Sequence, residues 1–173
     1  MIEATRLIDR LESFGVLLPA VAASFSLEDM RWKPADGAWS VLEVLRHLLD
    51  EEVLDFRRRL RQTIVAPDQP WPEIDPEKWA VDLRYNVDPP GPWVAKFSAE
   101  RKTSVAFLRG QDEGVWSTAY HHPKFGDIRA GDLLAAWAAH DALHLRQIAK
   151  RMYQLAQRDG AEFLTIYAGE WHA

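Results

Sequence analysis

The chain has 173 residues, of which 47% are hydrophobic and 27% are charged, a composition that is ordinary for a globular protein. A chain of this length is expected to form one domain, here residues 1–173. Its net charge of −5 gives no general attraction to nucleic acid or to anionic membranes, and no apolar run reaches membrane-spanning length. The N-terminus shows no signal-peptide pattern. We therefore expect a cytoplasmic protein that binds neither nucleic acid nor a membrane.

The first predicted helix spans about residues 3–24. Its apolar side chains recur at intervals of four and three residues, which is the spacing of a bundle helix. They are Leu7, Leu11, Phe14, Leu18 and Val21. Pro19 lies inside the segment and is expected to kink or divide the helix, because proline lacks a backbone donor and crowds the preceding turn.

The second predicted helix follows a turn at residues 34–37. Ser40 and Glu43 have the spacing of a capping box, in which the serine oxygen accepts a backbone N–H while the glutamate reaches back to the serine N–H. An apolar stripe then continues from Leu42 to Leu60. The stripe is wide, which indicates contacts on two sides, either with two neighbouring helices or with a second subunit.

The rest of the chain adds two more helices, at about residues 92–109 and 129–158. Residues 66–92 contain seven prolines, which exclude a long helix, and a connection of this length is typical of a lid or an interface segment. Residues 111–128 are expected to form an ordered loop with short extended pieces. Four helices, little strand pattern and one long crossover loop predict an all-α four-helix bundle.

The fourth predicted helix carries two histidines one turn apart, His140 and His144. Positions i and i+4 lie on the same face, so both rings can offer nitrogens to one metal ion. The alternative is a pair of core histidines that bond to the backbone or to carboxylates. Both histidines lie in an apolar stripe, where unpaired polar rings are costly. The chain has no cysteine, so nitrogen and oxygen atoms would have to hold any metal.

His47 lies on the second predicted helix, at the edge of its apolar arc rather than inside it. An exposed surface histidine is one interpretation of this position. The other is a metal ligand in a site that opens to solvent at one end of the bundle.

Two residues near these histidines are weak candidates for a catalytic role. Glu51 lies one turn after His47 and would orient water or act as a base, although a solvated surface carboxylate has the same pattern. His121 and His122 precede Pro123 in the loop before the fourth helix. Adjacent side chains of an extended segment point in opposite directions, so at most one of the two faces the metal, and His122 is the candidate.

Further polar residues have expected positions around the site. Gln147 lies one turn from His144, within reach of a hydrogen bond to that ring. Asp141 is about 100° from His140 around the helix, so it is expected to face away from the metal, on the helix surface. A basic run of four arginines at positions 57, 58, 59 and 61 spreads around its helix, which favours a solvated face over an anion clamp.

Two segments resemble the signatures of the DinB-like (YfiT-like) metalloenzyme family. The segment from Trp32 to Leu48, with Trp39-Ser40 and His47-Leu48, resembles its Trp-Ser…His-Leu motif. Residues 122–126 followed by 139–148 resemble its second signature, and the apparent alignment runs from about residue 10 to 155. One departure is Arg129, where the family often caps its fourth helix with Ser or Thr, and this leaves the start of that helix open.

The resemblance implies a fold and a metal site. It implies a four-helix bundle in up-down-down-up arrangement, often a homodimer, in which one histidine of the second helix and two of the fourth bind a divalent metal. These positions correspond to His47, His140 and His144. Three imidazoles leave open coordination positions, which is typical of catalytic sites. Nitrogen ligands suit zinc, nickel, copper or iron, and zinc and nickel are the expected ions.

The functions that follow from such a site belong to different classes. Some relatives of this kind use a low-molecular-weight thiol as co-substrate, which predicts a metal-dependent S-transferase or isomerase acting on a small molecule. The same site would serve a hydrolase that uses a metal hydroxide. The third alternative is a non-catalytic dimer that binds a metal or small molecule, related to stress response. The sequence does not decide whether the protein is an enzyme.

Overall fold

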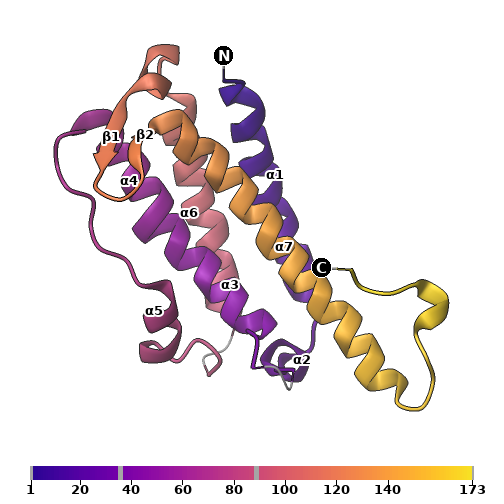
Figure 1. Cartoon of the computed structure of the whole chain (residues 1–173). Coiled ribbons are helices and arrows are strands. Elements are labelled where there is room, and N and C mark those ends of the chain that lie inside the picture. The colour runs from indigo at the N-terminus through magenta and orange to yellow at the C-terminus, as the bar shows by residue number, and fades with distance from the viewer. Residues whose placement is uncertain (1, 35–36, 88–89, 173) are drawn as a thin grey trace.

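The computed structural model describes residues 2–34, 37–87 and 90–172. Its bundle consists of four long helical segments, and the second of these is built from three consecutive pieces (Figure 1). The segments are α1 (Ala4–Ala23), α3 with η1 and α4 (Val41–Asp50, Glu51–Phe56 and Arg57–Val65), α6 (Gly91–Arg109) and α7 (Ala130–Gly160). The four predicted helices are therefore confirmed.

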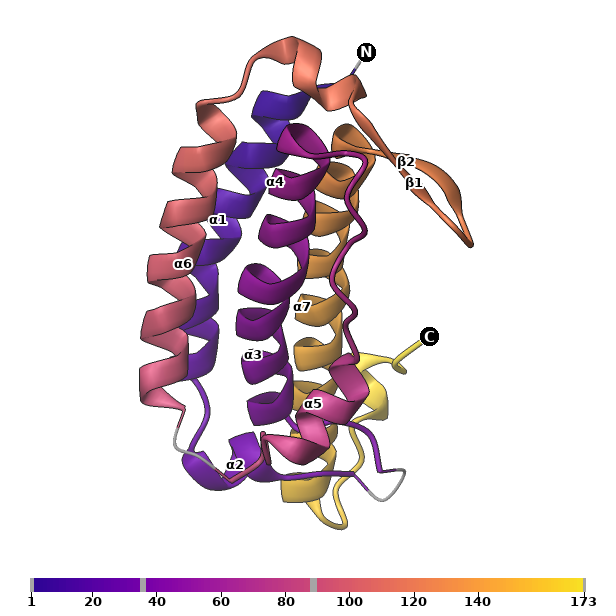
Figure 2. The same ribbon diagram turned by 90° about the vertical axis from the view of Figure 1, so that its left-hand side faces the viewer.

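The chain direction of these segments follows an up-down-down-up order. In Figure 2, α1 and α7 run in one direction, whereas α3–α4 and α6 run in the other. The crossover between α4 and α6 returns along the bundle and contains the short helix α5 (Pro76–Asp82). The all-α four-helix bundle with a long crossover is thus confirmed. No helix among the described residues combines the length and apolarity needed to cross a membrane.

The first helix is continuous through Pro19, so the expectation of a division there is wrong. Leu18 and Ala22, on either side of the proline, are both buried against the rest of the bundle. Pro19 cannot donate to the Gly15 carbonyl, which accepts from Ser98 Oγ at 3.4 Å instead, and the packing of the two apolar side chains holds the last turn in place. A short helix, α2 (Leu27–Arg31), then leads to the second long segment.

The capping box predicted at the start of α3 is present. The Glu43 N–H donates to Ser40 Oγ at 3.1 Å, and the Ser40 N–H donates to Glu43 Oε2 at 2.7 Å. These bonds satisfy orphan donors of the first turn and fix where the helix begins. They also fix the position of His47, which lies two turns further along.

The second long segment contains a π-helical stretch at Glu51–Phe56, directly after the turn that carries His47. Such stretches are rare inside α-helices and occur frequently at functional sites, because the wider turn changes the direction of the side chains that follow. Glu51, Glu52 and Asp55 all lie in this stretch and all three are buried. The sequence pattern gives no indication of this widened turn.

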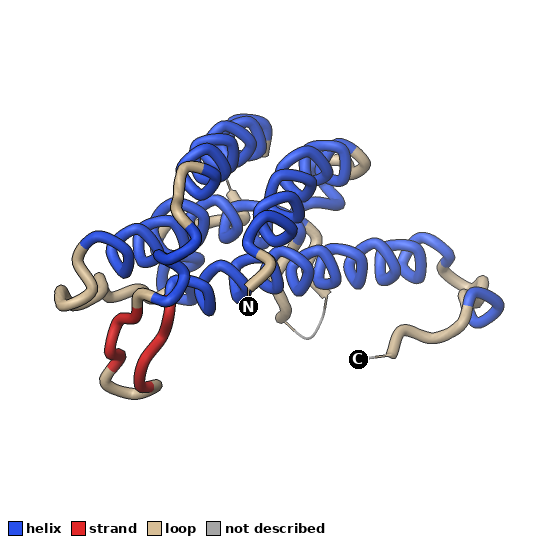
Figure 3. Tube along the Cα trace, turned by 90° about the horizontal axis from the view of Figure 1, so that it is seen from above, coloured by secondary structure: helices blue, strands red, loops and turns tan. Residues whose placement is uncertain are grey.

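Between α6 and α7 the chain forms a short 3-10 helix (Glu113–Ser117) and a small hairpin. Strand β1 (Ala119–His122) pairs antiparallel with β2 (Gly126–Arg129), and Figure 3 shows the hairpin projecting from one side of the bundle. Gly126 adopts a φ of 73° at the hairpin turn. The expected short extended pieces between residues 111 and 128 are therefore these two strands.

Two apolar clusters fill the bundle interior. One includes Leu42, Leu45, Leu49, Phe97 and Ile148. The other includes Leu11, Leu60, Leu108, Leu134 and Trp137. Side chains from all four long segments contribute to this core, so its packing sets the position of the second helix against the fourth.

Candidate metal centre

Three histidine side chains from two helices meet at their Nε2 atoms. His47 extends from α3, and His140 and His144 extend from α7. The Nε2 atom of His47 lies 3.3 Å from that of His140 and 3.1 Å from that of His144, and the two α7 atoms are 3.0 Å apart. The structure therefore brings together the three residues that the sequence analysis selected.

This triangle of nitrogens has the dimensions of a metal site. Nitrogens bonded to one zinc ion at about 2.0–2.1 Å lie about 3.4 Å apart at tetrahedral angles and about 2.9 Å apart at right angles. The observed separations of 3.0–3.3 Å fall between these limits. Hydrogen bonding cannot satisfy all three atoms, because each ring nitrogen carries either one hydrogen or one lone pair. At least two of the three Nε2 atoms must therefore both carry a hydrogen or both carry a lone pair, and two such atoms cannot bond to each other. A cation that accepts all three lone pairs removes this conflict.

The electrostatics of the cluster favour neutral rings. Burial, and to a smaller extent the nearby His144 ring, lowers the pKa of His47 and of His140 to about 3. Burial also lowers the pKa of His144. His47 is only 6% exposed, which rules out the interpretation of a surface histidine, whereas both α7 rings are half-buried. Neutral imidazoles carry the lone pairs that metal ligation needs.

A hydrogen bond orients one of the α7 rings. His144 Nδ1 lies 2.9 Å from Gln147 Oε1, so the ring donates from Nδ1 to the amide oxygen. This bond places the lone pair of His144 on Nε2, the atom that faces the other two histidines. The hydrogen bond between Gln147 and His144 that their spacing predicts is therefore confirmed.

His47 is held by an aromatic ring on one side and approaches a carboxyl group on the other. The Trp39 ring packs edge-on against it, with centroids 5.0 Å apart. Glu51 Oε1 lies 3.8 Å from His47 Nδ1, so the carboxyl group stands on the Nδ1 side of the ring rather than beside Nε2. Glu51 is 4% exposed, and the alternative of a solvated surface carboxylate is therefore wrong.

The carboxyl group of Glu51 has an unusual environment. Burial, together with charge repulsion by the neighbouring Asp55 and a hydrogen bond to it, raises its pKa to about 8. Arg59 pairs with Asp55, with Nε 3.0 Å from Oδ1, and its charge only partly offsets the rise in the pKa of Glu51. Glu51 is therefore protonated near neutral pH in the metal-free protein.

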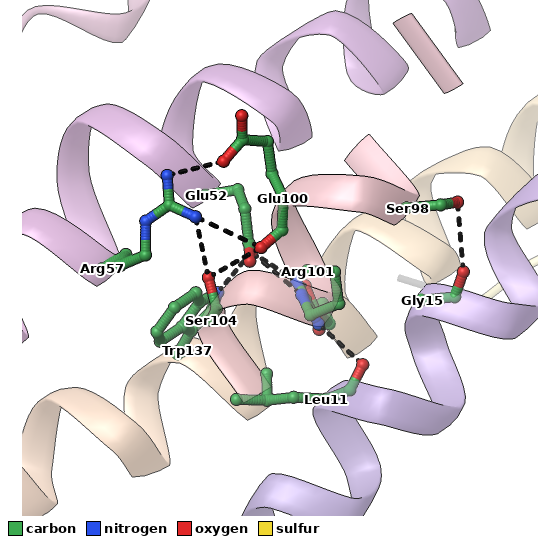
Figure 4. A network of polar contacts seen from close by, with 10 residues as sticks. Leu11, Gly15, Glu52, Arg57, Ser98, Glu100, Arg101, Ser104 and Trp137 are labelled. Carbon is green, nitrogen blue, oxygen red and sulfur yellow. Dashed lines mark hydrogen bonds and ion pairs between the residues drawn. The ribbon is translucent and has the colours of Figure 1, made fainter. Parts of the chain in front are cut away.

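A second polar cluster ties the helices together next to the histidines. The guanidinium of Arg101 on α6 donates to Glu52 at 2.9 Å, to Asp141 at 3.0 Å and to the carbonyl of Leu11 at 2.9 Å (Figure 4). Trp137 Nε1 also donates to Glu52, at 3.1 Å. Groups from all four long segments thus meet at one buried side chain.

The position of Asp141 corrects one expectation. Its carboxylate bonds to Arg101 and does not belong to the group of potential ligands, in agreement with its helical angle, but it is 4% exposed and not on the surface. Burial raises its pKa to about 6, against the opposing effect of Arg101. The partner comes from α6, forty residues earlier in the chain, so the spacing within α7 gives no information about it.

Arg101 is not among the residues predicted from the sequence. Its signal is present in the spacing, because Arg101 lies among Phe97, Ser104 and Leu108 at intervals of four and three, on the buried face of α6. Gly15 on α1 makes room for it, since a Cβ at that position would lie 2.7 Å from Arg101 Cγ. A charged residue at a core position of the apolar repeat points to a buried ion pair, because arginine is almost never fully buried without a partner.

The structure places His122 in the hairpin and not in the histidine cluster. Its Nδ1 accepts hydrogen bonds from the backbone N–H groups of Lys124 and Phe125, at 3.1 and 3.3 Å. His121 bonds to Asp127 across the hairpin at 2.7 Å. Among the described residues, the group of potential ligands contains only the three histidines of α3 and α7. His122 does not belong to that group in the described structure, so its position does not support a catalytic role for His122.

The start of the fourth helix, which the departure at Arg129 left open, is also defined. The helix begins at Ala130, with Arg129 at the N-cap position. Asp132 accepts from the Arg129 backbone N–H and from its side chain, both at 2.9 Å. An acidic residue three positions into the helix therefore supplies the half of a capping box that accepts from the N-cap N–H, whereas arginine cannot offer the side-chain acceptor that Ser or Thr has at the cap.

Comparisons with known proteins place the chain in a family. Two Oceanobacillus iheyensis proteins, each named "Putative metal-dependent hydrolase", are 22% and 25% identical to it. Both matches cover 82% of this chain, and they cover 80% and 81% of the respective relatives. The solved structure of YfiT from Bacillus subtilis, described as a "probable metal-dependent hydrolase with an unusual four-helix bundle topology", superposes with a TM-score of 0.78. It is 19% identical and the match covers 92% of this chain and 90% of YfiT. The DinB superfamily model matches residues 10–148, and the chain therefore belongs to the DinB superfamily.

Proposed function

We propose that His47, His140 and His144 bind one divalent metal ion and that the protein is a metal-dependent hydrolase. The observation that carries this proposal is the triangle of three neutral Nε2 atoms, 3.0–3.3 Å apart. The names of the two Oceanobacillus iheyensis relatives support the hydrolytic class.

The donor set of the cluster fits catalysis better than a purely structural site. Structural zinc sites are closed by four protein ligands, whereas catalytic sites keep positions open for water and substrate. Within the described part of the chain, no carboxylate or fourth histidine joins the three rings. A divalent ion bound there would supply Lewis acidity, which makes water a better nucleophile and polarises a carbonyl group.

The chain's own residues orient the ligands. Gln147 holds His144 in the tautomer with its lone pair on Nε2. Trp39 and Phe56 pack against His47 and His140, with ring centroids 5.0 and 4.9 Å apart, and restrict the rotation of both rings. The α7 histidines are half-buried whereas His47 is buried, so we expect solvent and a small substrate to approach the cluster from the α7 side.

The same donor set would also serve thiol-dependent S-transfer or isomerisation, and the test separates that chemistry from hydrolysis. Protein purified without an affinity tag is loaded with zinc or nickel and assayed against a panel of esters and amides, with and without an added low-molecular-weight thiol. The proposal expects turnover without thiol that is lost in His140→Ala and retained in His121→Ala, an exposed hairpin histidine. Turnover only in the presence of thiol would replace hydrolysis by S-transfer. Turnover that survives in His140→Ala would contradict the assignment of the site.

A further inference from the structure

A groove between α4 and α6 has a volume of about 490 Å³, and none of the residues that line it belongs to the candidate metal centre. Its rim carries three arginines of α4, Arg57, Arg58 and Arg61. Cavities of 300 to 1,000 Å³ are typical of sites for small molecules. The fourth residue of the basic run, Arg59, points elsewhere, since its Nε lies 3.0 Å from Asp55. Three of the four arginines therefore line one groove.

Two of the three arginines in the groove have no acidic partner among the described residues. Arg57 is neutralised by Glu100, with Nη2 and Oε2 2.7 Å apart, and it also donates to the Glu100 carbonyl (Figure 4). Arg58 and Arg61 are exposed, and neither forms an ion pair or a hydrogen bond with any residue that the structure describes. The groove thus has an excess of two positive charges on a chain whose net charge is −5.

The spacing of these arginines causes an electrostatic repulsion that a bound anion would reduce. Arg61 is three residues from Arg58 and four from Arg57, so the three side chains are neighbours on the same helix face. Like charges at these spacings repel and destabilise a helix. A carboxylate or phosphate between Arg58 and Arg61 would screen the repulsion and accept charge-assisted hydrogen bonds from both guanidinium groups.

The groove also has an apolar wall. Val53 and Val65 on one side and Phe107 on the other contribute to its lining. Val65 is 69% exposed, so it has no cover from the rest of the chain. An inorganic anion would leave this surface in water, whereas a ligand with an apolar chain or ring would bury it.

We propose that this groove binds a small anionic amphiphile. Its carboxylate or phosphate group lies between Arg58 and Arg61, and its apolar chain or ring lies against Val53, Val65 and Phe107. The concave shape and limited volume fit one soluble molecule rather than a membrane surface. The proposal does not depend on the histidine cluster or on hydrolytic activity.

Calorimetric titration of the full chain with matched eight-carbon probes tests the proposal. Octanoate and octyl phosphate carry the anion, octanol lacks charge, and octylamine is cationic. Acetate and inorganic phosphate test the free anion, and phosphatidylglycerol vesicles test a lipid surface. The variant is Arg58→Gln combined with Arg61→Gln. Its matched control is Arg10→Gln, an exposed arginine on α1 that lies outside the groove.

We expect octanoate and octyl phosphate to bind more tightly than octanol, octylamine, acetate and inorganic phosphate. The double variant should weaken octanoate binding about ten-fold, with no change in Arg10→Gln, since two charge-assisted contacts are lost. Backbone amide signals of Thr103 and Phe107 should shift on titration of the wild type. Equal binding of octanol, equal binding of acetate, an unaffected double variant, binding to vesicles alone or no binding of octanoate would each overturn the proposal.

Discussion

The Nε2 atoms of His47 and His140 lie 3.3 Å apart, although 93 positions separate the two residues in the chain. One ring comes from α3 and the other from α7, so the contact exists only when the second and fourth long segments pack in their native arrangement. An ion that binds both rings therefore binds the folded state and not the unfolded chain. Metal binding and folding stability are consequently linked.

The first prediction is that a divalent metal stabilises the protein. At a free zinc concentration of 100 times Kd, the free energy of unfolding should rise by about 2.7 kcal/mol. Urea denaturation of tag-free protein with zinc and with a chelator measures this difference. His140→Ala should show no such gain. An equal gain in wild type and variant would mean that zinc acts elsewhere on the chain.

The second prediction concerns Gln147, which accepts a hydrogen bond from His144 Nδ1 at 2.9 Å. Gln147→Leu removes the acceptor and keeps a side chain of similar size. Metal affinity should fall about 10- to 100-fold, the range found when groups that orient metal-bound histidines are lost. Competition with a chromophoric chelator measures Kd. Gln157→Leu, at an exposed position on the same helix, is the control, and equal effects of both substitutions would rule out a role in orienting the ring.

The third prediction is a pH dependence in the metal-free protein, and it rests on Glu51. Burial and Asp55 raise its pKa from 4.5 to about 8, so the folded state holds a proton that the unfolded state releases. The stability that this group contributes is complete below pH 4.5 and is lost as the pH rises through 8. Each pH unit in that window changes the contribution by about 1.4 kcal/mol at most.

Glu51→Gln mimics the protonated acid and removes this dependence. The free energy of unfolding of the variant minus that of the wild type should therefore increase between pH 5 and pH 8 and level off above that range. Urea denaturation in the presence of a chelator at several pH values gives the difference. A difference that stays constant with pH would show that Glu51 is ionised in the folded protein.

The fourth prediction concerns the buried guanidinium of Arg101. Arg101→Met leaves Glu52 and Asp141 buried without their shared cation, and it should destabilise the protein by about 3–5 kcal/mol. Adding Glu52→Gln and Asp141→Asn to the same chain should recover part of that loss, because the uncompensated charges are gone. Chemical denaturation measures both variants. A loss below about 1 kcal/mol for Arg101→Met would indicate that the network contributes little to stability.

Much of the fold follows from local patterns in the sequence. The capping box at Ser40 and Glu43 and the i, i+4 pair of His140 and His144 involve residues within one turn, so spacing alone predicts their geometry. The four helices follow from apolar periodicity in the same way. For the hairpin, the sequence predicts only an ordered loop with short extended pieces, because strands of four residues leave little pattern in the sequence.

The features that the sequence did not predict depend on contacts between distant segments. Helical projection placed His47 at the edge of an apolar arc, but α7 covers that edge and buries the ring. Asp141 was expected on the surface, and its burial depends on Arg101 from another helix. The π-helical stretch at Glu51–Phe56 also changes the directions of side chains, and an ideal α-helical projection does not account for it.

The most direct test of the metal centre is the stoichiometry and affinity of metal binding in wild type and single variants. Metal-free protein without an affinity tag is titrated with cobalt, whose absorption reports the coordination, and then with zinc in competition. We predict one ion per chain in the wild type. Binding should weaken by at least about 100-fold in His47→Ala, His140→Ala and His144→Ala, and it should be unchanged in His121→Ala. Stoichiometric binding that persists with the same affinity in all three cluster variants would contradict the three-histidine centre.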